Sequence, residues 1–233
     1  MSPQRRHASI AALACAAAAA CLMGCSRKQD PAEPAHLAEQ ALPAASRVAT
    51  APGQPGPGDP VNMAIASAKE DLLRSIAAAG WVVADPVDKV NTNRMVRAVL
   101  AMEPYPTAPV SPLELLGRPQ DFAIEQAAGP TPASRHHARL WDSGLRTKEG
   151  TPVWLVSATF DKAVAKSLAT GKFTHEITPE VDVERDKLAA DLAAACKSAP
   201  MLVEGFGQAA LASNADGFAY STDRKLAAID CAH

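Results

Sequence analysis

The sequence lacks both a marked excess of basic residues and a second long apolar segment. Over 233 residues, 23 Lys and Arg stand against 25 Asp and Glu, which gives a formal net charge of −2. Domains that bind nucleic acid through its phosphates usually carry a clear basic excess, so the charge argues against a nucleic-acid partner. No apolar run of about eighteen residues follows residue 30, and no membrane-spanning helix is expected there.

Familiar catalytic and metal-binding signatures are also missing. The sequence contains no HExxH, CxxC or GxSxG motif, which are the simplest signs of a zinc peptidase, a metal or thiol-redox site and an α/β-hydrolase. We therefore expect no cofactor and no metal. Whether the chain is an enzyme stays open at this point.

The N-terminus has the pattern of a bacterial lipoprotein signal. Residues 5–7 are basic, and residues 8–21 form an uncharged, alanine-rich segment of signal-peptide length. Leu22-Met23-Gly24-Cys25 then resembles a lipobox, in which a small residue precedes the cysteine that is acylated and becomes the new N-terminus. We expect residues 1–24 to be the signal and Cys25 to carry the lipid. The alternative is an ordinary cleavable signal with a free cysteine nearby.

A lipid on Cys25 would make the membrane the first partner of this chain. Two or more acyl chains anchor a protein stably, whereas one does so only marginally. Ser26 follows the cysteine, at the position where an aspartate would favour retention in the inner membrane. The sequence therefore predicts a lipoprotein that faces the periplasm, with the outer membrane favoured.

The remaining cysteines suggest a disulfide. Cys15 and Cys21 would leave with the signal and Cys25 would be acylated, so that only Cys196 and Cys231 remain. Two cysteines in the oxidising periplasm favour a disulfide between them. Two separately buried thiols are the alternative.

The chain divides into a predicted tether and one domain. Residues 25–60 are rich in Pro, Ala and Gly and are predicted to be a disordered spacer; residues 61–233 are predicted to be globular. Apolar residues at helical spacing predict helices over 64–79 and 87–102, the second with Val90, Met95, Val96, Val99 and Leu100 facing inward. A third helix is expected between Thr178 and Lys197. Strands are predicted at 121–127, 135–141, 152–160, 173–177, 201–206, 217–221 and 225–230.

These elements predict an α/β fold of the α+β type. The sheet should be mixed and largely antiparallel, with helices covering it. The apolar, β-branched run from Pro152 to Phe160 is expected at a central position in this sheet.

Four separated motifs occur in an order that resembles one family. They are SPLELLGRPQD (111–121), RHHARLW (135–141), PVWLVSATFD (152–161) and THEITPEVDVERDKLAADL (174–192). Together they resemble the LssY C-terminal domain family over most of residues 66–230. In that family the domain is often joined to membrane parts of the DedA-like and type-2 phosphatidic acid phosphatase kinds. The resemblance implies a fold and a membrane setting, but no reaction.

Candidate functional residues lie on the predicted strands. Side chains alternate between the two faces of a strand, so Arg135, His137 and Arg139 should share one face. Ser157, Thr159 and Asp161 on the next strand would present a polar face to them. The other candidates are Arg118, Asp121 and His175.

Three interpretations of these residues compete. Arg118, Arg135 and Arg139 could bind an anionic component of the cell envelope, because guanidinium groups suit phosphate and carboxylate oxygens. His137, His175 and Asp161 could instead form a hydrolase site that acts on a phosphorylated lipid or envelope precursor. In the structural interpretation, Arg139 pairs with Asp161 and Arg118 with Asp121. The prediction is a module that binds an envelope ligand or envelope protein, with the hydrolase as the alternative.

Overall fold

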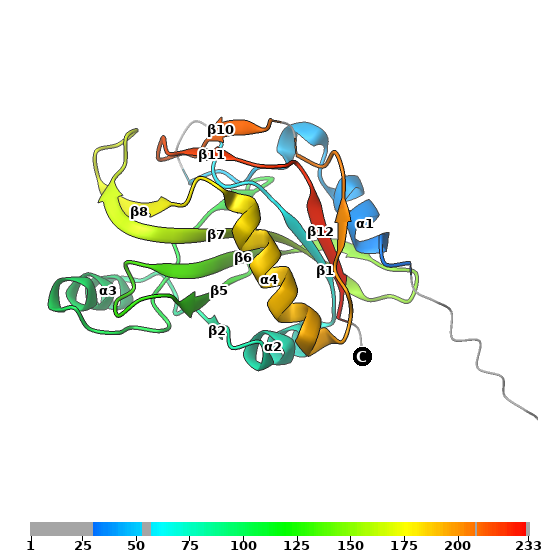
Figure 1. Cartoon of the computed structure of the whole chain (residues 1–233), viewed down its shortest axis with the longest axis horizontal. Coiled ribbons are helices and arrows are strands. Elements are labelled where there is room, and N and C mark those ends of the chain that lie inside the picture. The colour runs from blue at the N-terminus through cyan, green and yellow to red at the C-terminus, as the bar shows by residue number, and fades with distance from the viewer. Residues whose placement is uncertain (1–29, 53–56, 208, 232–233) are drawn as a thin grey trace, which may run out of the picture.

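A mixed eight-stranded sheet forms the centre of the molecule (Figure 1). The structure, a computed structural model, describes residues 30–52, 57–207 and 209–231. The main path of the sheet runs β2-β5-β6-β7-β1-β12-β9, and β8 also pairs with β7. The strands of this sheet are β1 (Met63–Ala66), β2 (Val82–Val83), β5 (Phe122–Ala127), β6 (Arg135–Arg146), β7 (Pro152–Lys166), β8 (Phe173–Ile177), β9 (Met201–Val203) and β12 (Leu226–Asp230).

The strand pairing confirms the predicted α+β fold with a largely antiparallel sheet. Of the described strand pairs, β1 and β12 are parallel and the others are antiparallel. The central position expected for residues 152–160 is also confirmed, because β7 lies between β6 and β1. The remaining elements are two small hairpins, β3–β4 (Glu114–Leu115 and Arg118–Pro119) and β10–β11 (Leu211–Ser213 and Ala219–Ser221), and the helices α1 (Glu33–Ala41), η1 (Ala44–Ser46), α2 (Lys69–Ala78), α3 (Lys89–Ala101) and α4 (Val181–Cys196).

Helices α4 and α2 cover one face of the sheet. Figure 1 shows α4 crossing in front of the strands, with α2 near its C-terminal end. Leu188 and Leu192 of α4 are fully buried and pack in one apolar cluster with Trp154, Val156 and Ala158 of β7. The alternation along β7 thus sends its even-numbered residues into this core.

A disulfide closes the same side of the domain. Cys196 ends α4 and is joined to Cys231, which directly follows β12. Both cysteines belong to the core under α4. The structure therefore contains the pairing that the cysteine count favoured over two separate thiols.

Helix α1 covers part of the opposite face. Ala35 and Ala38 of α1 pack in a second apolar cluster with Trp141, Val153 and Leu155. The predicted disordered spacer is therefore wrong for the described residues between 30 and 60, which contain α1 and part of this core. Small alanine side chains let α1 approach the sheet closely, so composition alone misled the prediction. The predicted boundary at residue 61 is wrong for the same reason.

The predicted helix over residues 64–79 is two elements. Met63, Ala64, Ile65 and Ala66 are all buried and form β1, and α2 begins only at Lys69. A short run that is buried on both faces has no period, so spacing cannot distinguish a buried strand from a buried helix there.

Helix α3 is also oriented differently from the prediction. Ala98 and Met95 pack against Tyr105 and Ala108, but Val90 and Leu100, which were predicted to face inward, are 73% and 79% exposed.

No helix in the described part of the chain is long and apolar enough to cross a membrane.

Candidate functional site

The candidate site lies on the same face of the sheet as α1. It occupies the end of β6 and β7 that α1 does not cover. The antiparallel register places Arg135 opposite Asp161, His137 opposite Thr159 and Arg139 opposite Ser157. The odd-numbered residues of both strands therefore point to one side, as the alternation along the two strands predicted. Toward the other end of these strands the same face is apolar and packs against α1.

Two arginines are held in buried ion pairs. Arg135 donates from Nε to Asp161 at 3.0 Å and from Nη1 to Glu125 at 2.7 Å. Arg139 donates from Nη1 to Asp59 at 2.9 Å and from Nε to the carbonyl of Ser111 at 2.9 Å. Charges that are removed from water persist only when they are paired and hydrogen-bonded. These contacts therefore fix both guanidinium groups.

Burial and charge shift the pKa values of the carboxyl groups in opposite directions. Burial raises the pKa of Glu125 to about 7, although Arg135 lowers it in part. Burial also raises the pKa of Asp59 against the effect of Arg139. For Asp161, burial raises the pKa, but positive charge on His137 and His175, present when they are protonated, and on Arg135 outweighs burial and brings the pKa to about 2. Asp161 is therefore the firmly ionised acid of the group.

His137 is a neutral imidazole held in one tautomer. Burial is the main cause that lowers its pKa well below the ordinary value of 6.5. Its Nε2 lies 3.1 Å from Nη1 of Arg139 and 3.0 Å from Oγ1 of Thr159. Because a guanidinium group can only donate, Nε2 accepts and the proton sits on Nδ1. That Nδ1 lies 3.4 Å from Oδ2 of Asp161.

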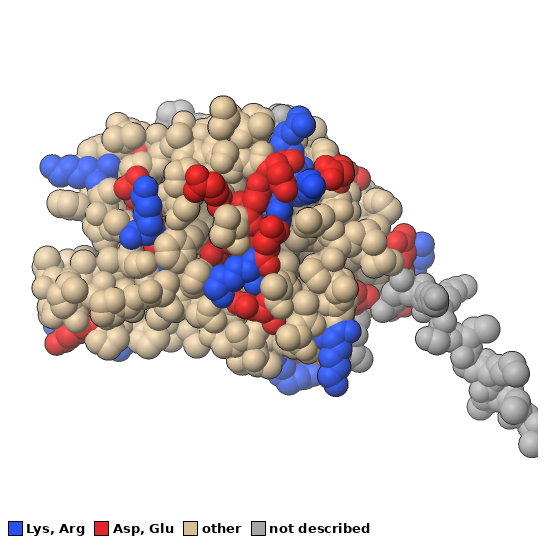
Figure 2. Space-filling model, viewed as in Figure 1, with Lys and Arg blue, Asp and Glu red and all other residues tan. Residues whose placement is uncertain are grey.

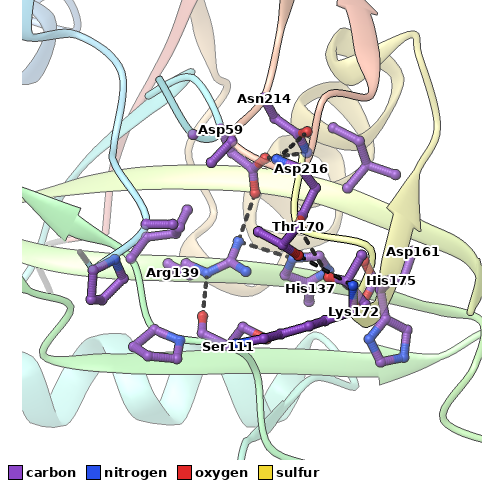
Figure 3. Close-up of a pocket in the computed structure, with 18 of the residues that line it drawn as sticks. Asp59, Ser111, His137, Arg139, Asp161, Thr170, Lys172, His175, Asn214 and Asp216 are labelled. Carbon is purple, nitrogen blue, oxygen red and sulfur yellow. Dashed lines mark hydrogen bonds and ion pairs between the residues drawn. The ribbon is translucent and has the colours of Figure 1, made fainter. Parts of the chain in front are cut away.

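These side chains form the floor of a pocket of about 330 Å³, here called the polar pocket. In Figure 3, Arg139 lies between Asp59 and His137, and dashed lines join the three. The acids in the lining are Asp59, Asp161 and Asp216, and the bases are Arg135, Arg139 and Lys172. The formal charges of this lining therefore cancel when its histidines are neutral.

The rim of the polar pocket comes from β8 and from a loop far from it in the sequence. Asn214 donates to Asp59 at 3.4 Å, and Thr174 of β8 donates to Asp216 at 3.0 Å. His175 contacts the carbonyl of Pro132 through Nε2 at 3.1 Å, and burial lowers its pKa. The rim thus offers hydroxyl, amide, imidazole and carboxylate groups to one space.

Most of the candidate residues meet at this pocket. Arg135, His137, Arg139, Asp161 and His175 all line it. The pairing expected between Arg139 and Asp161 is wrong, because Arg139 pairs with Asp59 and Arg135 pairs with Asp161.

Arg118 and Asp121 lie elsewhere. They form an exposed ion pair at 2.9 Å, and Arg118 also donates to the carbonyl of Asp142 at 2.6 Å. Since neither lines the polar pocket, the arrangement supports the structural interpretation of this pair and not a ligand contact.

Sequence analysis missed several lining residues. Asp59 lies in the segment that was predicted to be disordered, and Lys172, Asn214 and Asp216 lie in loops. Loop residues carry no periodic pattern that would bring them to a sheet. The one usable signal was the position of Asp59, four residues before a continuous apolar run that begins at Met63.

No group of three or more His, Cys, Asp or Glu side chains in the described ranges is placed to hold a metal ion.

The predicted signal and lipidated Cys25 lie outside the residues that the structure describes.

Comparison with known protein families gives a match over most of the chain. The family model described as LssY C-terminus matches residues 40–226, from within α1 to the start of β12. No curated protein and no solved structure matched the chain. The four motifs noted in the sequence all lie inside the matched range, and they supply β3, β4, the first part of β6 and most of β7, β8 and α4. This chain therefore belongs to the LssY C-terminus family.

Proposed function

We propose that this protein is a membrane-anchored envelope lipoprotein whose LssY C-terminal domain binds a small polar ligand in the polar pocket. The observation that carries the binding function is the set of buried, fixed charges on the pocket floor. Replacing buried ion pairs by packed apolar residues is often neutral or stabilising. A domain that keeps Arg135–Asp161 and Arg139–Asp59 beside a cavity therefore gains something other than stability from them.

The charge balance narrows the ligand class. Arg135 and Arg139 already have carboxylate partners at 3.0 Å and 2.9 Å, and the acids and bases of the lining cancel. Such a site favours a molecule that offers both donors and acceptors, either a zwitterion or a hydroxyl-rich compound. A simple anion should bind this neutral lining less strongly than it would bind a site formed by three unpaired arginines.

Titration calorimetry tests this ligand class. The sample is residues 30–233, which contain both apolar clusters and the disulfide. The probes are phosphocholine as the zwitterion, maltose as the polyol and glycerol 3-phosphate as the anion. We expect binding of the zwitterion or the polyol, and at least tenfold weaker binding of the anion.

Lys172→Gln should weaken binding because Lys172 lies on the rim, while Lys148→Gln, on an exposed loop away from the pocket, should not. Tightest binding of the anion, or binding of none of the three probes, contradicts the proposal.

The anchor is supported by the sequence pattern that ends at Cys25. Incorporation of labelled palmitate into the full chain should be lost in Cys25→Ala and kept in Cys21→Ala. Labelling that survives in Cys25→Ala would show that this cysteine is not the anchor.

A hydrolase is the second candidate. Asp161, His137 and Thr159 form a row of carboxylate, imidazole and hydroxyl, with separations of 3.4 Å and 3.0 Å. This order is the one that activates a hydroxyl nucleophile. However, Thr159 is fully buried, is not in the pocket lining, and shares Nε2 of His137 with Arg139. Thr159→Val should therefore leave ligand binding intact, and any phosphatase or esterase activity that it abolished would establish the hydrolase instead.

A further inference from the structure

A second, apolar cavity adjoins the polar pocket. It has a volume of about 440 Å³ and lies between α3 and the β7–β8 hairpin; we call it the apolar groove. Its apolar lining consists of Met95, Val96, Val99, Leu100, Val164 and Phe173.

The two cavities share part of their walls. Ser111, Phe173, Thr174 and His175 line both. His175 also neighbours the charged floor, because its proximity to Asp161 affects the pKa values of both groups. The polar pocket and the apolar groove are therefore adjoining parts of one site rather than separate holes.

The apolar groove is open to solvent. Leu100 is 79% exposed, Phe173 is 78% exposed and Val96 is 49% exposed. Figure 2 shows mostly uncharged surface around α3 on the side in view. Contiguous exposed apolar surface in a folded domain usually marks a place where something binds.

We infer that the ligand is an amphiphile whose polar head occupies the polar pocket and whose single apolar tail lies along the apolar groove. This inference rests on the proposed ligand-binding function and extends it to the tail. At the shared wall, which includes Phe173 and His175, the surroundings change from polar to apolar. A ligand whose polar head is joined directly to an apolar tail requires such a boundary. Burial of each methylene strengthens binding about fourfold, so even a partly covered tail has a measurable effect.

Matched probes with and without a tail test the inference. Binding to residues 30–233 is measured by calorimetry for phosphocholine against dodecylphosphocholine, and for maltose against dodecyl maltoside, all below the micelle concentrations. For at least one pair, we expect the tailed compound to bind at least tenfold more tightly than its head alone.

Surface variants locate the tail. Val96→Asn/Leu100→Gln changes exposed groove residues and should remove the gain from the tail without altering the affinity for the head. Val90→Asn/Leu211→Gln changes residues that are 73% and 79% exposed and lie outside the groove, and it should keep the gain. Because all four side chains are exposed, both variants should fold.

The outcomes separate the inference from the proposed function. Equal affinity of head and tailed compound would overturn the amphiphile while the polar-ligand function stands. Failure of every probe to bind would overturn both. A tail gain that persists in Val96→Asn/Leu100→Gln would show that the groove is not the tail site. Loss of a dimer in that variant, with no tail gain in the wild type, would assign the groove to a second copy of the chain instead.

Discussion

The two faces of β6 and β7 are built from the same strands by different means. On the face toward α4, Ala138, Leu140, Val156 and Ala158 pack in a dry apolar core. On the other face, Arg135, His137, Arg139 and Asp161 are just as inaccessible to solvent. One face is stabilised by removing apolar area from water, whereas the other must balance charge against charge. Burial alone therefore does not show which part of a sheet serves stability and which serves a ligand.

Breaking one ion pair on the charged face should have the largest effect. Arg139→Met leaves Asp59 buried without its cationic partner, and we expect the free energy of unfolding to fall by about 3–5 kcal/mol in urea denaturation at neutral pH. The double variant Arg139→Met/Asp59→Leu makes this part of the face apolar and should recover most of the loss. A double variant as unstable as the single one would show that the charges stabilise the fold as a pair.

The apolar face can be tested through its disulfide. Cys196 and Cys231 are separated by 35 residues, and the chain-entropy model gives a contribution of about 3–4 kcal/mol for a loop of that length. Cys196→Ala/Cys231→Ala should lose this amount in urea denaturation without reductant. Wild-type protein treated with reductant should unfold at the same urea concentration as the variant. A variant as stable as the oxidised protein would mean that packing under α4 suffices.

Stability should depend on pH through two opposing groups on the charged face. The pKa of His137 lies well below 6.5, mainly through burial, so the unfolded chain takes up its proton first and stability falls as the pH drops below about 6.5. The pKa of Glu125 is about 7, mainly through burial. The folded chain therefore takes up this proton first, and stability rises as the pH drops from 7 toward 4.5.

Two variants separate these contributions. Between pH 7 and 5, Glu125→Gln should lose stability more steeply than the wild type, and His137→Gln less steeply. Each difference should be at most about 1.4 kcal/mol per pH unit, read from urea denaturation at a series of pH values. Parallel curves for the three proteins would refute both assignments.

The smallest change in stability is expected for the exposed ion pair of Arg118 and Asp121, which lies outside the apolar core and the polar pocket. Arg118→Ala removes one member of an exposed ion pair, and such pairs contribute about 1 kcal/mol or less. Thermal unfolding should change slightly, and binding of the probes at the polar pocket should not change. Weaker binding of the probes to Arg118→Ala would show that Arg118 contributes to the ligand site after all.

The sequence predicted the fold and the candidate site only where it contains a periodic pattern. The alternation in β6 and β7 was strong enough to place Arg135, His137, Arg139 and Asp161 on one face, and the structure has them there. The partner of Arg139 was not predictable, because it depends on where a distant loop brings Asp59.

The missed elements have physical causes of their own. The alanine-rich α1 looks like a spacer in composition, yet small side chains are what allow it to lie close to the sheet. Strand β1 is buried on both faces and so has no period to detect. For α3, helical spacing predicted the helix correctly, but not that its apolar side chains would remain open to solvent.

The parallel pairing of β1 with β12 has a consequence for the order of folding. Met63 lies beside Ala227, and the same strand pairs with β7 on its other side. A chain that emerges from its N-terminus therefore carries β1 with one edge unpaired until β12 has been synthesised. Pairings this distant in sequence slow folding, because the intervening loop must be closed first. The domain should accordingly fold as a unit only once β12 is available to pair with β1.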